Sequence, residues 1–440
     1  YINELGQRLL KAFPPQQLTY HFYVINQPVF NAFAGPGGHV FINSGLLEAM
    51  DSDSELAGIL GHEIAHVASR HISQKIGRAG KIQMVTLAGL VAGILLGAGG
   101  GGDVASALTV GSLAAGQSLS LAYSRDDERQ ADQVGLKYLN DSGYTGDGLL
   151  KVLKKIKETQ WYGDLIPDYL KTHPGTDERI IYISNRSEKP TPVDPAIRKR
   201  QVQDFQRAKI RLMALYGDTG NAAARFNALL EKDPGDASAH LGYGLLAERT
   251  GDRNAAKSFL KKALEKQAFD PYLLTDLGRI YFKNGEFESA LKTLKSAAGI
   301  GPDIPETLLA LGRTQLAMGM APEAERSIRK ILNDRPNHLP AIYELSKVYG
   351  EQGKMAHAHY HLAHFYAEIG NLRKAMLNLK QAKKQATEPE IKEKIEAAIK
   401  KTDPDFKKLQ KKQKEQREQE QEQQRQQQSR RRQQGQRQQR

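Results

Sequence analysis

The sequence contains no cysteine and a single tryptophan among 440 residues. The absence of thiols excludes disulfide bonds, thiolate nucleophiles and cysteine-ligated metal sites, and it leaves the redox compartment open. Long apolar runs are also scarce, because the uncharged run Ile82–Ala98 has only 17 residues, the lower limit for crossing a bilayer. With 40% hydrophobic residues, the chain is long enough for two or more domains with cores of their own.

Positive charge is concentrated at one end of the chain. The formal net charge is +13, and residues 407–440 contribute +8 through 12 basic and 4 acidic residues in a glutamine-rich background. The remainder carries only +5, so nucleic acid is not an expected partner. Because the tail has no periodic apolar face to offset the entropy of ordering, we predict that residues 403–440 are disordered or only partly helical.

The most informative stretch is Gly61–His66, which contains an HExxH motif. Ser52 and Glu55 form a capping-box start for a helix that includes this motif, with apolar residues at helical spacing. Two histidines four residues apart share one helix face and can bind the same metal ion, with Glu63 beside them. The pattern therefore predicts a hydrolytic zinc site with one ion per chain.

A catalytic zinc needs a third protein ligand and an open position for water. The acidic run Tyr123–Asp132 places Glu128 and Asp132 four residues apart on a predicted helix. One carboxylate can bind the metal while the other accepts a hydrogen bond from a ligand histidine and fixes its tautomer. A solvated acidic face is the alternative, but the presence of an HExxH helix favours the metal site.

Four motifs occur in a characteristic order: Asn31–Phe41, HExxH, SRxxExxAD at 124–132, and Thr172-His173-Pro174 followed by Arg179. In this order they resemble the HtpX-type zinc endopeptidases of peptidase family M48. The resemblance extends from about Tyr1 to Lys400, and it is strongest to periplasmic members that also carry helical repeats.

The resemblance assigns roles to individual residues. It implies that zinc is bound by His62, His66 and Glu128. It also implies a general base at Glu63 and a supporting carboxylate at Asp132. The substrate-binding edge strand would run through Asn31, Ala32, Phe33 and Ala34.

Two residues beyond the third-ligand helix have more than one possible role. His173 lies in a loop that Pro174 and Gly175 keep from becoming helix, and Arg179 follows it. Both could stabilise the oxyanion of the tetrahedral intermediate. As the resemblance implies, His173 could instead occupy the fourth metal position and keep the enzyme latent. We expect this second role, with His173 within coordination distance of the metal.

Residues 1–186 are predicted to form a gluzincin-like α+β metallopeptidase domain. We expect a first helix at Ile2–Ala12 and a small antiparallel sheet over the HExxH helix, with a later helix from Glu128 to about Glu158. The strands expected in the sheet are Leu18–Ile25, Val29–Ala34 and His39–Asn43. A proline-containing linker follows at 187–200.

The region 82–122, whose one charged residue is Asp103, lies between the two metal motifs. A buried or lid-like helical hairpin over the catalytic cleft is our first interpretation. A hairpin that dips into a membrane is the second, which leaves open a contact with a membrane surface. A transmembrane span is the least favoured, because Ile82–Ala98 is short and rich in glycine.

The second half of the chain repeats every 34 residues, as shown by Gly217, Gly251, Gly285, Gly319 and Gly353. This is the tetratricopeptide period of one helix–turn–helix unit. Residues 201–402 are therefore predicted to form an α-solenoid that binds partner proteins on its concave face. Four histidines cluster near its end, but they fall on different faces and we expect no metal there: His357, His359, His361 and His364.

These features predict a zinc-dependent endopeptidase with a protein-binding repeat domain. The resemblance implies action on misassembled envelope or outer-membrane proteins in the periplasm, and contact with the outer-membrane assembly machinery. The chain begins at Tyr1 without an initiator methionine or signal peptide, which suggests a processed or trimmed form of an exported protein. The rival hypothesis is a chaperone or assembly scaffold with a latent metal site.

Overall fold

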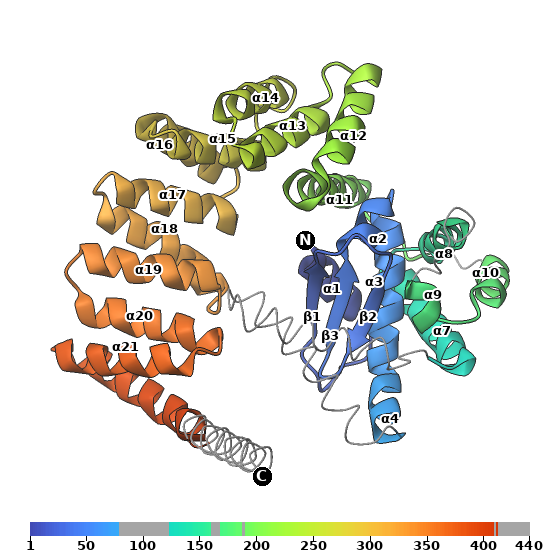
Figure 1. Cartoon of the computed structure of the whole chain (residues 1–440), viewed down its shortest axis with the longest axis horizontal. Coiled ribbons are helices and arrows are strands. Elements are labelled where there is room, and N and C mark those ends of the chain that lie inside the picture. The colour runs from blue at the N-terminus through green and yellow to red at the C-terminus, as the bar shows by residue number, and fades with distance from the viewer. Residues whose placement is uncertain (79–122, 160–167, 187–189, 409–410, 412–440) are drawn as a thin grey trace, which may run out of the picture. The chain divides into compact units, whose positions relative to one another are not determined.

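The structure is a computed structural model that describes residues 1–78, 123–159, 168–186, 190–408 and 411. The chain is mainly helical in these ranges and forms two compact units, Tyr1–Ala268 and Phe269–Arg440 (Figure 1). The predicted hairpin at 82–122 lies outside the described residues, as does the tail after residue 411. Within the described part, no helix combines the length and the apolar character that crossing a membrane requires.

The first unit contains a mixed three-stranded sheet in the order β1–β3–β2. Its strands are His21–Ile25 (β1), Ala32–Gly35 (β2) and His39–Asn43 (β3). The predicted antiparallel pairing is correct for β2 and β3 but wrong for β1, which runs parallel to β3. The parallel pairing results from the connection between the strands. The chain passes from β1 to the far edge of the sheet, forms β2 there, and then turns back to form β3 between the two.

One face of this sheet packs against helices α1 (Ile2–Leu10) and α3 (Asp53–Ala68). Helix α2 (Ser44–Ala49) joins the sheet to α3. The core between these layers consists of large aliphatic and aromatic side chains that are almost completely buried: Leu5, Leu9, Phe22, Val40, Ile42, Ile59 and Leu60. The HExxH helix is therefore an interior helix, and its polar side chains need partners inside the protein.

Helices α7 (Arg125–Asp141) and α8 (Asp147–Thr159) pack directly on α3. The prediction of one helix continuing to Glu158 is wrong, because Gly143 takes a left-handed φ of 79° between the two helices. A Cβ atom at Gly135 of α7 would lie only 3.2 Å from the carbonyl oxygen of Gly61 in α3. The missing side chain thus lets the two helices that carry the metal motifs approach closely.

Three more helices complete the surroundings of the site: α9 (Asp168–Thr172), α10 (Thr176–Ser184) and α11 (Pro195–Tyr216). Helix α11 begins inside the segment predicted as a linker and contacts α2 and α3. Its Phe205 is 1% exposed and belongs to the same core as α3. The domain boundaries at 186, 200 and 402 stay a prediction.

Consecutive helices of similar length follow α11, as the repeat period predicts. They are α12 (Thr219–Lys232), α13 (Ala237–Thr250), α14 (Arg253–Lys266), α15 (Pro271–Lys283), α16 (Phe287–Ile300), α17 (Pro305–Ala317), α18 (Ala321–Asp334), α19 (Leu339–Glu351), α20 (Met355–Glu368) and α21 (Leu372–Gln385). Residues 389–408 are also helical, so this last helix includes the first residues of the predicted tail. Four glycines of the 34-residue series take left-handed φ values of 73° to 91°: Gly251, Gly285, Gly319 and Gly353. Gly217 instead has a φ of −70°.

Candidate metal centre

Helix α3 presents both histidines of the HExxH motif to one buried point. Ser52 caps the helix by accepting a hydrogen bond from the Glu55 N–H at 3.3 Å, which sets where the helix begins. His62 and His66 then lie one turn apart with their Nε2 atoms 3.0 Å from each other. Both side chains are fully buried. The two ring nitrogens therefore converge as ligands of a single ion would.

Helix α7 brings Glu128 to the same point from a distant part of the sequence. Its start is set by a capping box, in which Ser124 and Asp127 each donate a backbone N–H to the other's side chain. One carboxylate oxygen of Glu128 lies 3.2 Å from His66 Nε2, and the other lies 3.4 Å from His62 Nε2.

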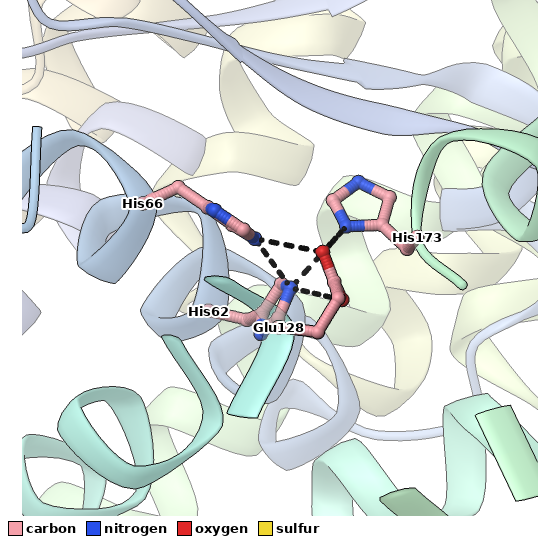
Figure 2. Close-up of side chains that lie close together, drawn as sticks. All are labelled: His62, His66, Glu128 and His173. Atoms are coloured by element: carbon pink, nitrogen blue, oxygen red, sulfur yellow. Dashed lines mark hydrogen bonds and ion pairs between the residues drawn. The ribbon is translucent and has the colours of Figure 1, made fainter. Parts of the chain in front are cut away.

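His173 directly follows α9 and contributes a fourth donor. Its Nδ1 lies 3.0 Å from Glu128 Oε1 and 3.4 Å from His62 Nε2. The Tyr169 ring stacks on the imidazole with centroids 4.2 Å apart. Ligand atoms of the two α3 histidines, Glu128 and His173 all lie within 4.8 Å of one another (Figure 2). Across the described residues, this is the one group of histidines and carboxylates with such geometry.

The residues of this group suit a metal ion. Three imidazoles and one carboxylate are a donor set that proteins use for divalent transition metals. Both carboxylate oxygens of Glu63 and the Nε2 of His173 are buried without a hydrogen bond, an arrangement that is costly unless another group pairs with them. Burial also raises the pKa of Glu63. A metal ion and its water ligand would supply the missing partners.

Asp132 and Arg179 form a second layer of contacts behind the donor group. Asp132 Oδ1 lies 2.9 Å from His62 Nδ1, the ring nitrogen that faces away from the group. Arg179 donates to both Asp132 oxygens at 2.8 Å, and its Nη1 lies 2.6 Å from Glu128 Oε2. Burial acts to raise the pKa values of the two carboxyls, but nearby positive charge from Arg179 and the histidines lowers both, that of Glu128 well below its usual range. The oxyanion role of Arg179 stays a prediction.

The predicted substrate strand lies at the edge of the sheet. Ala32, Phe33 and Ala34 belong to β2, whose one strand neighbour in the described sheet is β3. Asn31 precedes the strand, and its carbonyl accepts a hydrogen bond from the Asn43 N–H at 2.9 Å. Because β2 is an edge strand, one of its sides has no strand partner in the described sheet. An extended peptide needs such a side to bind as an additional strand.

Two residues that contact His66 were not predicted from the sequence. Tyr123 stacks on the His66 ring with centroids 3.7 Å apart, and His71 lies 2.9 Å from the His66 Nδ1. The signal for His71 was present as a third histidine five residues after the HExxH motif. The contact between His71 and His66 depends on the turn that follows α3, and the sequence pattern does not reveal that turn.

Comparison with known protein families agrees with this geometry. Residues 1–187 match peptidase family M48, and tetratricopeptide-repeat patterns match residues 214–280, 249–304, 281–346 and 356–387. The buried group of three histidines and Glu128 lies within the first match. The chain therefore contains a peptidase family M48 domain, which is followed by tetratricopeptide repeats.

The chain is distantly similar to beta-barrel assembly-enhancing protease (BepA). It is 28% identical to that protease of Yersinia pestis over 357 residues, which cover 73% of this chain and 72% of the relative. It is 27% identical to the Escherichia coli protein over 334 residues, covering 75% and 67%. Mitochondrial metalloendopeptidase OMA1 of Arabidopsis thaliana is 30% identical over 165 residues, covering 37% and 30%.

Proposed function

We propose that this chain is a zinc-dependent endopeptidase in which His62, His66 and Glu128 bind the metal and Glu63 is the general base. The observation that supports this most directly is the buried convergence of these donors beside a carboxylate with no hydrogen-bond partner. Zinc is the metal that suits such nitrogen and carboxylate ligands in a hydrolytic site. It would lower the pKa of a bound water and polarise the scissile carbonyl.

The protein side chains handle the proton and the orientation of the ligands. Glu63 takes a proton from the attacking water and delivers it to the leaving amine. Its raised pKa, caused first by burial, makes the carboxylate a stronger base. Asp132 accepts the Nδ1–H of His62, so that Nε2 is free to face the ligand position. Arg179 holds both carboxylates in their charged forms.

The substrate binds in an extended form along β2, with its scissile bond next to the metal. Backbone hydrogen bonds to an edge strand hold a peptide with little regard to its side chains, which suits a peptidase that acts on unfolded segments. The repeats provide a second protein-binding element.

The substrates are misassembled envelope or outer-membrane proteins in the periplasm, and the repeats contact the outer-membrane assembly machinery. This rests on the motif resemblance and on relatives whose name refers to beta-barrel assembly. Its test compares cleavage of one outer-membrane β-barrel protein in its unfolded and folded forms. Equal cleavage of both forms would contradict a role against misassembled proteins.

The peptidase is distinguished from a scaffold with a latent metal site by zinc content and casein cleavage. Wild-type protein should contain about one zinc and cleave casein, while Glu63→Gln should keep the zinc and lose turnover, because the base and not a ligand is removed. If zinc is stoichiometric but both forms are equally inactive on every unfolded substrate, the scaffold hypothesis is correct.

His173 keeps the site latent by occupying it. Its Nδ1 faces the donor group, and its Nε2 lies 3.5 Å from Glu63 Oε1, so one ring contacts both the metal position and the base. We expect His173→Ala to raise basal casein cleavage or self-cleavage, while the same change at the exposed His21 has no effect. Lower activity of the His173 variant with zinc retained would favour the oxyanion role.

A further inference from the structure

A turn after helix α3 brings a third histidine against the HExxH motif. Helix α3 ends at Ala68, and helix α4 (His71–Arg78) begins three residues later. Arg70 lies between them with a φ of 58°, the one non-glycine residue of the described chain in the left-handed region. This unusual conformation turns the chain sharply, and His71 is 3% exposed beside His66. An arginine held there indicates that the position of His71 is constrained by the surrounding structure.

His71 links His66 to helix α7 through a chain of side-chain contacts. Its Nδ1 lies 2.9 Å from His66 Nδ1, and its Nε2 lies 2.8 Å from Gln130 Oε1. The Oδ1 atom of Asp127 lies farther from the same Nε2, at 3.8 Å. The contacts run in one line from the metal ligand through an imidazole to an amide on the helix that also carries Glu128.

The proton positions along this chain follow from metal binding. If His66 binds the ion through Nε2, its Nδ1 must carry the proton and donate it. His71 Nδ1 must then accept, which leaves the proton of His71 on Nε2. That N–H has an acceptor in Gln130 Oε1. The reverse direction would place the proton of His66 on Nε2, where it would prevent metal binding.

The two HExxH histidines therefore have different partners behind them. His62 Nδ1 faces the carboxylate of Asp132, which Arg179 holds in place. His66 Nδ1 faces a neutral imidazole whose far side is bonded to an amide. Both partners involve α7, so this helix supports the two ligands as well as supplying the third.

We infer that His71, supported by Gln130, is a positioning residue that orients His66 for metal binding. The inference rests on the proposed role of His66 as a zinc ligand. Hydrogen bonds of this kind to the far nitrogen of a ligand histidine typically change metal affinity by about 10- to 100-fold. The effect should therefore be visible in zinc binding itself, independently of peptide cleavage.

Two substitutions separate hydrogen bonding from packing. His71→Phe keeps a ring of similar size but has no acceptor. His71→Asn loses volume but places its Oδ1 where the imidazole has Nδ1, since both atoms are bonded to Cγ. Zinc affinity of the full chain is measured by competition with a chromophoric chelator, and the melting temperature of each zinc-free protein checks folding.

We expect His71→Phe to weaken zinc binding about 10- to 100-fold and His71→Asn to keep most of the wild-type affinity. Gln130 lies on the exposed side of α7, and Gln130→Leu should weaken zinc binding less than His71→Phe does. Gln74→Ala, an exposed glutamine of α4, is the matched control and should have no effect. If His71→Phe is misfolded, Gln130→Leu decides the question: weaker zinc binding with an unchanged melting temperature supports the inference, and wild-type affinity overturns it.

Wild-type affinity in both His71→Phe and Gln130→Leu would overturn the inference, and so would equal losses in His71→Phe and His71→Asn. These outcomes leave the proposed function intact. If wild-type protein itself binds no zinc, the proposed function fails instead, so the two failures can be told apart.

Discussion

The metal centre and the repeats use buried positions in opposite ways. In the metal centre, seven ionisable side chains are at most 4% exposed and lie in one group: His62, Glu63, His66, Glu128, Asp132, His173 and Arg179. In the repeats, the periodic buried positions are small or aliphatic, as in Ala256, Ala290, Leu260 and Leu294. Apart from Glu63, whose carboxylate has no hydrogen bond, each of these seven side chains has a specific polar partner within the group. Each repeat position is instead one copy of a common pattern.

This difference indicates where single substitutions have large effects. A buried charge depends on one partner, so its loss leaves an uncompensated group in the interior. A repeat position contacts mainly its neighbouring helices, and the stability of the array is distributed over several copies of the repeat. Function should therefore be sensitive at the centre, and the repeats should tolerate substitutions with smaller, local losses of stability.

The largest expected difference concerns metal content. Glu128→Ala should reduce bound zinc from about one per chain to near zero, because it removes the proposed carboxylate ligand. Glu325→Ala removes a partly buried carboxylate of α18 that is paired with Arg329, and it should leave zinc unchanged. Elemental analysis of both purified proteins measures this. Full zinc in the Glu128 variant would defeat the ligand assignment.

The next difference concerns two arginines of the first unit. Arg179→Met leaves Asp132 and Glu128 buried without their cation and should lower the free energy of unfolding by about 3–5 kcal/mol. Arg125→Met removes an exposed pair with Glu178, whose net contribution should be about 0–1 kcal/mol. Urea denaturation of the two variants gives the comparison. Equal losses would show that burial does not distinguish the two ion pairs.

The smallest expected effects lie in the repeats and have opposite signs. Gly285→Ala should destabilise by about 1–2 kcal/mol, because φ is 77° although no atom lies within 4 Å of the added methyl. Gly299→Ala, in the last turn of α16 and equally open, should stabilise by about 0.5 kcal/mol. Thermal unfolding of the full chain tests both. The same sign for both would mean that backbone conformation is not what selects glycine at 285.

The sequence predicted the features that depend on residues close together along the chain. A spacing of four residues places His62 and His66 on one helix face in any α-helix, and a 34-residue period defines helical pairs without knowledge of their packing. The left-handed glycines at the repeat turns likewise follow from local backbone geometry. The second metal motif was recognised by its pattern, although its distance from the first could not be calculated from sequence.

Tertiary structure decided how these local elements meet. The parallel pairing of β1 with β3 depends on which edge the chain reaches after β1, and side-chain alternation carries no information on that choice. The approach of α7 to α3 depends on Gly135 facing the Gly61 carbonyl. His173 comes within 3.4 Å of His62 across 111 residues, and His71 reaches His66 only through the strained turn at Arg70. Helical spacing follows from bonds along the backbone, whereas these contacts arise from packing between segments whose relative positions no local pattern records.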